Sequence, residues 1–121
     1  MIDLIVAKLK THPTVKNVVP FGSALPSAPY VVVKGETTSF GYVRYRINAH
    51  YAQGQQKFME AYIRKDVYNL LHNVLLSDTV DTTRVYIIRA DPENSIGQVV
   101  TNNSDGTISQ DRIFRAPEVQ D

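Results

Sequence analysis

Residues 42–76 read YVRYRINAHYAQGQQKFMEAYIRKDVYNLLHNVLL. In this stretch the spacing of apolar residues changes from that of a strand to that of a helix. From position 43 to 51 the odd residues are apolar or aromatic and the even residues are polar, which is typical of a strand with one buried face. After Gly54 the period becomes helical, and one apolar stripe gathers Met59, Ile63, Val67, Leu70, Leu71 and Val74. We therefore predict a strand over residues 42–52 and a long helix over residues 55–76, ending at Ser77 and packing against a sheet.

Shorter elements are predicted on both sides of this unit. Residues 2–9 show the i, i+3, i+4, i+7 apolar spacing of a short amphipathic helix. The expected strands are residues 15–19, 30–34, 84–90, 98–101 and 107–114. The expected connections are the proline-marked residues 20–29, the polar residues 35–41 and the turn 91–94, with a hairpin turn at Asp105-Gly106.

Length and composition favour one folded domain. The chain has 121 residues, of which 43% are hydrophobic and 21% charged, and this balance separates it from disordered chains. Strands and helices in this order predict a single α+β domain over residues 1–115, with a mixed or antiparallel sheet. The polar residues 116–121 are expected to form a flexible C-terminal tail.

Composition also limits the classes of function. The chain has no apolar run long enough to cross a bilayer and no signal peptide, so we expect a cytoplasmic protein without membrane contact. It contains no cysteine, which excludes disulfides, thiolate nucleophiles and cysteine-based metal sites.

The two halves of the chain differ in charge. Residues 1–65 carry nine Lys/Arg against three Asp/Glu, or +6, whereas residues 66–121 carry four against nine, or −5. Such polarity suits head-to-tail pairing between copies of one subunit. The alternative is that both signs mix on every face of the folded chain.

Local motifs give no credible catalytic, cofactor or metal site. Gly22-Ser23 follows a predicted strand, as in nucleotidyltransferases, but those enzymes need paired aspartates shortly downstream to bind metal ions. Here the first acid after Ser23 is Glu36 and the first aspartate is Asp66. We therefore interpret Gly22-Ser23 as a turn and expect a protein that is not an enzyme and binds no cofactor.

The histidines and the basic strand offer two weaker possibilities. His12, His50 and His72 lack the spacing that would direct two of them to one metal, so each is expected to make surface or polar contacts. Residues 42–50 mix aromatic and basic side chains, as nucleic-acid-binding sheets do. Because Tyr45 alternates inward, Tyr42 alone remains as a stacking platform, and a small nucleic-acid-binding module is kept as an alternative.

Several stretches together resemble a known family. They are the lead LPSAP (25–29) into YVVV (30–33), the strand YRINAHY (45–51) followed at once by a long helix, and final strands that carry SDG (104–106) and RIFR (112–115). Over most of residues 1–115 the chain resembles the tail-terminator, or tail-completion, proteins of long-tailed bacteriophages.

The resemblance implies a fold, an assembly and a location. The fold would be a curved sheet with the short N-terminal helix and the long helix on one face. The assembly would be a homomeric ring, usually a hexamer, that stops growth of the tail tube and docks the neck of the virion. Its partners would be copies of itself, the tail tube protein and the head–tail connector, and DNA would at most pass through the lumen. Assembly would take place in the cytoplasm of the bacterial host. The alternative within this class is another neck or head-closure subunit.

Contact surfaces between subunits are expected on the polar strand face and in residues 35–41 and 91–97. The candidate inter-subunit ion pairs join cations on one side to acids on the other: Arg44, Arg46 and Arg64 with Asp91 and Glu93. The alternative for each is a solvated charge. Since these positions are predicted outside the core, replacing Arg44 and Arg46 by Glu is expected to weaken self-association without unfolding the monomer.

Overall fold

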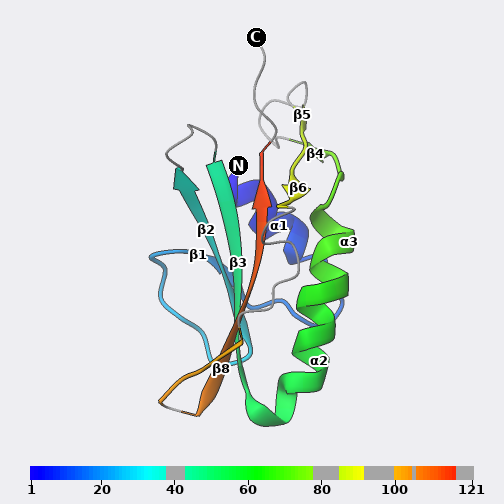
Figure 1. The fold of residues 1–121 in the computed structure, drawn as a ribbon. Helices are drawn as coiled ribbons and strands as arrows, with labels where there is room; N and C mark the ends of the chain where they lie inside the picture. The colour runs from blue at the N-terminus through cyan, green and yellow to red at the C-terminus, as the bar shows by residue number, and fades with distance from the viewer. Residues whose placement is uncertain (38–42, 78–84, 92–99, 105, 117–121) are drawn as a thin grey trace.

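Helices cover one face of a mixed sheet (Figure 1). The computed structural model describes residues 1–37, 43–77, 85–91, 100–104 and 106–116. The helices are α1 (Ile2–Leu9), α2 (Gln56–Ala61) and α3 (Val67–Leu71), with a 3₁₀ turn η1 (Gln53–Gln55) before α2 and a π-helical turn η2 (Tyr62–Asp66) between α2 and α3. The strands are β1 (Val18–Pro20), β2 (Tyr30–Thr37), β3 (Val43–Ala52), β4 (Leu76–Ser77), β5 (Val85–Tyr86), β6 (Arg89–Ala90), β7 (Val100–Asn102) and β8 (Thr107–Arg115). This confirms the predicted α+β domain with a short N-terminal helix and one long helix.

The sheet order sets which side chains meet. The order is β1-β2-β3-β8-β6, with β1 parallel to β2, the other neighbours antiparallel, and β7 also paired with β8. Val33 lies opposite Ile47 and Tyr45 lies opposite Phe114. Because side chains alternate along a strand, this register gathers the apolar residues on the face beneath the helices. The inward alternation predicted for Tyr45 is confirmed.

The side chain of Ile2 in α1 packs close to the backbone of Gly35 in the sheet. A Cβ at Gly35 would lie 3.3 Å from Cδ1 of Ile2, the first residue of α1, and 3.7 Å from Cε1 of Tyr45. Gly35 is part of β2, which extends to Thr37, so the prediction that a loop begins at residue 35 is wrong. In the sequence Gly35 indicated a turn, but in the structure it is a strand residue at which α1 comes close to the sheet.

The long helix ends earlier than its apolar stripe predicts. It runs from Gln56 through the π-helical turn to Leu71, not to residue 76. Asn73 adopts a left-handed conformation with φ 57°, and its N–H donates to the carbonyl of Ile88. Leu76–Ser77 then pairs with Val85–Tyr86 as a short strand. The helix therefore ends at Leu71 because residues 73–77 pair with residues 85–88, although the apolar spacing of the sequence would allow the helix to continue.

The remaining strands differ from the predictions mainly at their ends. β1 is shifted toward Pro20, and the strand expected over residues 84–90 is split into β5, which pairs with β4, and β6, which pairs with β8. The hairpin into β8 is confirmed: Gly106 has φ 85°, and the Asn103 N–H donates to the Thr107 carbonyl. The turn expected at residues 91–94 lies outside the described residues after Asp91, as do residues 38–41 and 117–121.

His12 fastens the segment after α1 to the long helix. Its Nδ1 accepts the backbone N–H groups of Thr14 and Val15, at 3.1 and 3.0 Å. The ring proton therefore lies on Nε2, which donates to Asp66 Oδ2 at 2.8 Å. The imidazole also packs edge-on against Tyr62, where burial raises the pKa of the phenol well above its ordinary value. The sequence prediction of a polar contact at His12 is confirmed, but the residue is buried.

Replacing His12 by Ala is expected to lower the free energy of unfolding by about 2 kcal/mol, because the backbone N–H groups of Thr14 and Val15 lose their acceptor and the hydrogen bond of Val15 is buried. Urea unfolding followed by circular dichroism measures the change. His12→Asn is the matched variant, since a side-chain amide oxygen can accept N–H groups two or three residues later, and it should recover about half of the loss. Equal losses for both variants would contradict the role assigned to Nδ1.

Candidate functional site

No described helix covers the sheet face opposite α1, α2 and α3, which we call the uncovered face (Figure 1). It is formed by alternate side chains of the three long strands. These are Tyr30, Val32, Lys34 and Glu36 from β2, Arg44, Arg46, Asn48 and His50 from β3, and Ser109, Asp111, Ile113 and Arg115 from β8. Most of them are half-buried by one another, although no described helix lies over them. Several of these side chains are joined by ion pairs and hydrogen bonds.

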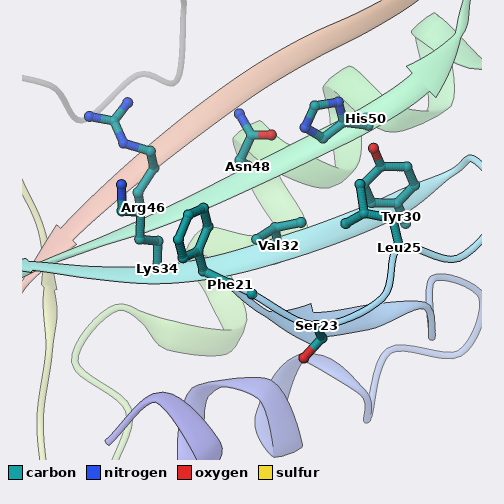
Figure 2. Close-up of a pocket in the computed structure, with 10 residues that line it drawn as sticks. Phe21, Ser23, Leu25, Tyr30, Val32, Lys34, Arg46, Asn48 and His50 are labelled. Atoms are coloured by element: carbon teal, nitrogen blue, oxygen red, sulfur yellow. The ribbon is translucent and has the colours of Figure 1, made fainter.

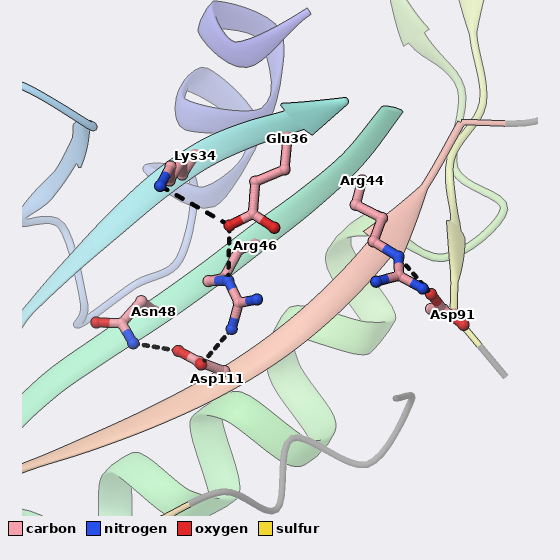
Figure 3. A network of polar contacts seen from close by, with 7 residues as sticks. All are labelled: Lys34, Glu36, Arg44, Arg46, Asn48, Asp91 and Asp111. Atoms are coloured by element: carbon pink, nitrogen blue, oxygen red, sulfur yellow. Dashed lines mark hydrogen bonds and ion pairs between the residues drawn. The ribbon is translucent and has the colours of Figure 1, made fainter. Parts of the chain in front are cut away.

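Arg46 is the centre of an ion-pair network on this face (Figure 3). Its Nε lies 3.1 Å from Glu36 Oε1, and its Nη1 lies 2.7 Å from Asp111 Oδ2. Asn48 donates to the other oxygen of Asp111, and Lys34 Nζ lies 3.9 Å from Glu36 Oε1. The hydrogen bond to Glu36 raises the pKa of Arg46, Asp111 adds to the effect, and partial burial opposes it. Two cations are thus offset by two carboxylates of the same chain.

Arg44 makes a second ion pair at the end of the face (Figure 3). Its Nε lies 3.4 Å from Asp91 Oδ2. The Asp91 side chain is only 2% exposed, and its backbone N–H donates to the carbonyl of Ile113, which holds the residue against β8. Asp91 therefore serves the fold of its own chain, where the sequence predicted a turn residue that faces another subunit.

The structure brings together only part of the predicted contact set. Arg44 and Asp91 are partners within one chain, and Arg46 is held by Glu36 and Asp111. Arg64 is exposed on the helix layer, on the opposite side of the sheet. Glu93 lies outside the described residues. An inter-subunit role for these residues stays a prediction.

A hollow of about 410 Å³ lies between the uncovered face and the chain that leaves β1 (Figure 2). Its floor includes Val32 and the ring of Tyr30, which stacks on His50 with centroids 4.8 Å apart. Its rim includes Phe21 and Leu25, which are 66% and 61% exposed. Lys34 Nζ lies 4.6 Å from the centre of the Phe21 ring. The hollow is therefore apolar at its floor and rim, with cations at one end.

Sequence reasoning missed the rim of this hollow. Phe21 and Leu25 fall in the proline-marked connection, which was interpreted only as a rigid link. The available signal was the presence of two large apolar side chains that belong to no periodic element and so have no predicted place in the core.

Ser109 and His50 form a hydroxyl–imidazole contact on the same face, with Oγ and Nδ1 3.0 Å apart. Such a pair also occurs in nucleophilic catalysis, where a third group orients the base and donors stabilise an oxyanion. Here the imidazole is stacked on Tyr30, and Ser109 Oγ accepts a hydrogen bond from Asn103 Nδ2 at 2.9 Å. These contacts tie β8 and its hairpin to β3, which is a structural role.

The described residues contain neither a metal-ligand cluster nor a helix that could span a membrane. In that part of the chain no three His, Asp or Glu side chains are grouped to hold a metal ion. None of the described helices is long and apolar enough to cross a membrane. Comparison with protein-family models gives no match to this chain, and comparison with curated proteins gives no match either.

Proposed function

We propose that the chain is a structural virion protein of the head–tail junction of a long-tailed phage. In this proposal it forms a homomeric ring that terminates the tail tube and docks the neck. The resemblance of residues 1–115 to tail terminators supports this assignment, and so does the opposite charge of the two halves of the chain. The observation that carries it is the uncovered sheet face with its apolar hollow.

The composition of this face resembles a protein contact. Interface cores are enriched in Tyr, Phe and Arg, and charges within them need partners. Tyr30, Phe21 and Arg46 lie together here, and the guanidinium already has two carboxylate partners. A protein surface can therefore cover this face without leaving a buried charge unpaired.

The ion pairs of Lys34 and Arg46 also make this face a poor binding surface for nucleic acid, the alternative function. Binding to a polyanion gains its affinity from cations that neutralise phosphates. Lys34 and Arg46 are offset by Glu36 and Asp111, which lie within 4 Å of them. Phosphate contacts would have to displace these carboxylates, so we favour an adjacent tail protein as the occupant of the hollow, and specifically the tail tube protein.

The ring is tested by the absolute mass of the purified protein, measured by light scattering over a range of concentrations. Six copies of the 13.6 kDa chain would give about 82 kDa. A closed oligomer of defined size is the expected result. A protein that stays monomeric at every concentration, with or without tail tubes, would contradict the proposal.

The docking face is tested by the double variant Phe21→Ser, Leu25→Ser. We expect at least tenfold weaker co-sedimentation with tubes assembled from the tail tube protein of the same virus, because the apolar rim of the hollow is lost. Stability should change by less than about 0.5 kcal/mol per substitution, since both side chains are exposed.

Phe58→Ser is the matched control for the docking test. Phe58 is 48% exposed but lies on α2, on the other side of the sheet. Its replacement should leave tube binding unchanged. Equal loss in the control and the double variant would exclude the hollow as the docking site. Binding to the head–tail connector in place of the tube would favour the alternative, a different neck or head-closure subunit.

A further inference from the structure

The hollow on the uncovered face follows from the sizes of six side chains on β2 and β3. They form three cross-strand pairs in register, which are Tyr30 with His50, Val32 with Asn48, and Lys34 with Arg46. The middle pair has the shortest side chains, and longer ones stand on either side of it along the strands (Figure 2). A group that enters the hollow therefore reaches deepest over Val32 and Asn48.

The side chain of Asn48 supplies a hydrogen-bond acceptor to the hollow. A carboxylate can only accept hydrogen bonds, so the amide group that meets Asp111 is Nδ2, and Oδ1 is turned away from that partner. No described residue donates to Oδ1. Because Asn48 is half-buried, a ligand that displaces water from the hollow must donate to this oxygen or leave it without a partner.

The ion pairs beside the hollow disfavour a charged ligand. Lys34 and Arg46 each lie within 4 Å of Glu36, and Arg46 also pairs with Asp111. An incoming cation would meet the two basic groups, whereas an incoming carboxylate would meet two acids and the acceptor oxygen of Asn48. The hollow therefore favours an uncharged donor.

The rest of the lining favours an aromatic ring. Phe21 and Tyr30 supply aromatic surface, and aromatic pairs gain more than their buried area alone provides. Lys34 Nζ already lies 4.6 Å from the centre of the Phe21 ring, so the basic end of the hollow is compatible with an aromatic face. The volume of about 410 Å³ is at the small end of the range of about 300–1,000 Å³ for ligand pockets.

We infer that the hollow binds the side chain of a tyrosine, whose ring packs on the apolar lining and whose hydroxyl donates to Asn48 Oδ1. This inference rests on the proposed function, because the tyrosine would belong to the tail tube protein that docks on this face. A phenol carries its donor at the tip of the ring, where it reaches the deepest part of the hollow. The N–H of an indole lies at the side of the ring, so tryptophan fits less well.

The test uses p-cresol, which is the tyrosine side chain without its backbone, and toluene, which lacks the hydroxyl. Dissociation constants are measured on the full-length protein by saturation-transfer NMR of the ligand, which suits a monomer and a ring alike. Asn48→Leu removes the acceptor and keeps a similar volume, and Phe58→Ser on the other side of the sheet is the control. Circular dichroism establishes that each variant is folded, and Asn48→Ala replaces Asn48→Leu should that variant fail to fold.

We expect the wild type to bind p-cresol about fivefold more tightly than toluene, which corresponds to one net hydrogen bond. The two ligands should bind equally to Asn48→Leu, whereas Phe58→Ser should keep the preference. Equal affinities in the wild type, or a preference that survives in Asn48→Leu, would overturn the inference. A larger loss for 3-methylindole than for p-cresol in Asn48→Leu would assign the hollow to a tryptophan instead.

Competition with tail tubes separates this inference from the proposed function. At ten times its dissociation constant, p-cresol should weaken co-sedimentation with the tubes about tenfold, because both would occupy the hollow. Competition by p-cresol and toluene alike would uphold docking at the hollow and overturn the tyrosine. A preference for p-cresol without competition would uphold the phenol site and overturn docking of the tube there.

Discussion

Replacing Arg44 by Glu is expected to destabilise the fold by about 3 kcal/mol or more, because it leaves a buried carboxylate without its cation and adds a like charge. Asp91 is 2% exposed and lies 3.4 Å from the Arg44 guanidinium. Two carboxylates at this distance would repel one another in a site that water reaches poorly. Urea unfolding of the variant at neutral pH measures the loss.

Lys57→Glu is the control for this prediction, since it makes the same charge change at an exposed position and should cost less than about 0.5 kcal/mol. Arg44→Gln should fall between the two, because it removes the cation without adding a negative charge. A loss no larger than that of the control would show that the Arg44–Asp91 pair does not contribute to stability.

The ion pair between Arg44 and Asp91 also changes the effect that we expect from replacing both Arg44 and Arg46 by Glu. Sequence reasoning expected it to weaken self-association alone. The structure ties Arg44 to buried Asp91 and Arg46 to Glu36 and Asp111, so we now expect the double variant to lose stability as well. Weakened assembly of that variant would therefore report on folding as much as on an interface.

Replacing Arg112 by Ala is expected to cost about 3 kcal/mol, because it opens a cavity beneath the long helix and leaves the carbonyl of Arg64 without this donor. Arg112 is 7% exposed and lies on the inner face of β8. Its guanidinium lies 5.0 Å from the centre of the Tyr68 ring, and burial lowers the pKa of the group. Its Nε has no hydrogen-bond partner among the described residues.

Arg112→Met separates the packing of this side chain from its charge. Methionine fills most of the same volume and removes a cation that is costly to bury, so its loss should stay below about 1.5 kcal/mol. Both variants are compared by chemical unfolding with the same probe. A loss for Met as large as that for Ala would mean that the hydrogen bond to Arg64 outweighs packing at this position.

The central strand and helix could be predicted because the spacing of apolar residues along the chain is a local property of the sequence. The alternation around Ile47 specified a strand with one buried face, and the apolar stripe from Met59 to Leu71 specified the helix that covers it. The hairpin at Gly106 followed from turn chemistry alone. Each of these features depends on residues a few positions apart.

Contacts between distant segments could not be predicted in the same way. The residues around Leu71 do not indicate that the N–H of Asn73 will donate to the carbonyl of Ile88 and so end the helix. The uncovered face is a similar case, because the hollow needs Phe21 and Leu25 to lie over β2 and β3. Sequence shows that these side chains are apolar, and only the folded chain shows that they remain exposed.

The fold class, the central strand and helix and the opposite charge of the two halves could be predicted, since they follow from composition and from the short-range periodicity of apolar residues. The partners of the charges could not be predicted and became visible in the folded chain. Arg44 pairs with Asp91, and Arg46 pairs with Glu36 and Asp111, all within one chain. An ion pair requires distances of a few ångströms, and here the register of long-range strand pairs sets those distances.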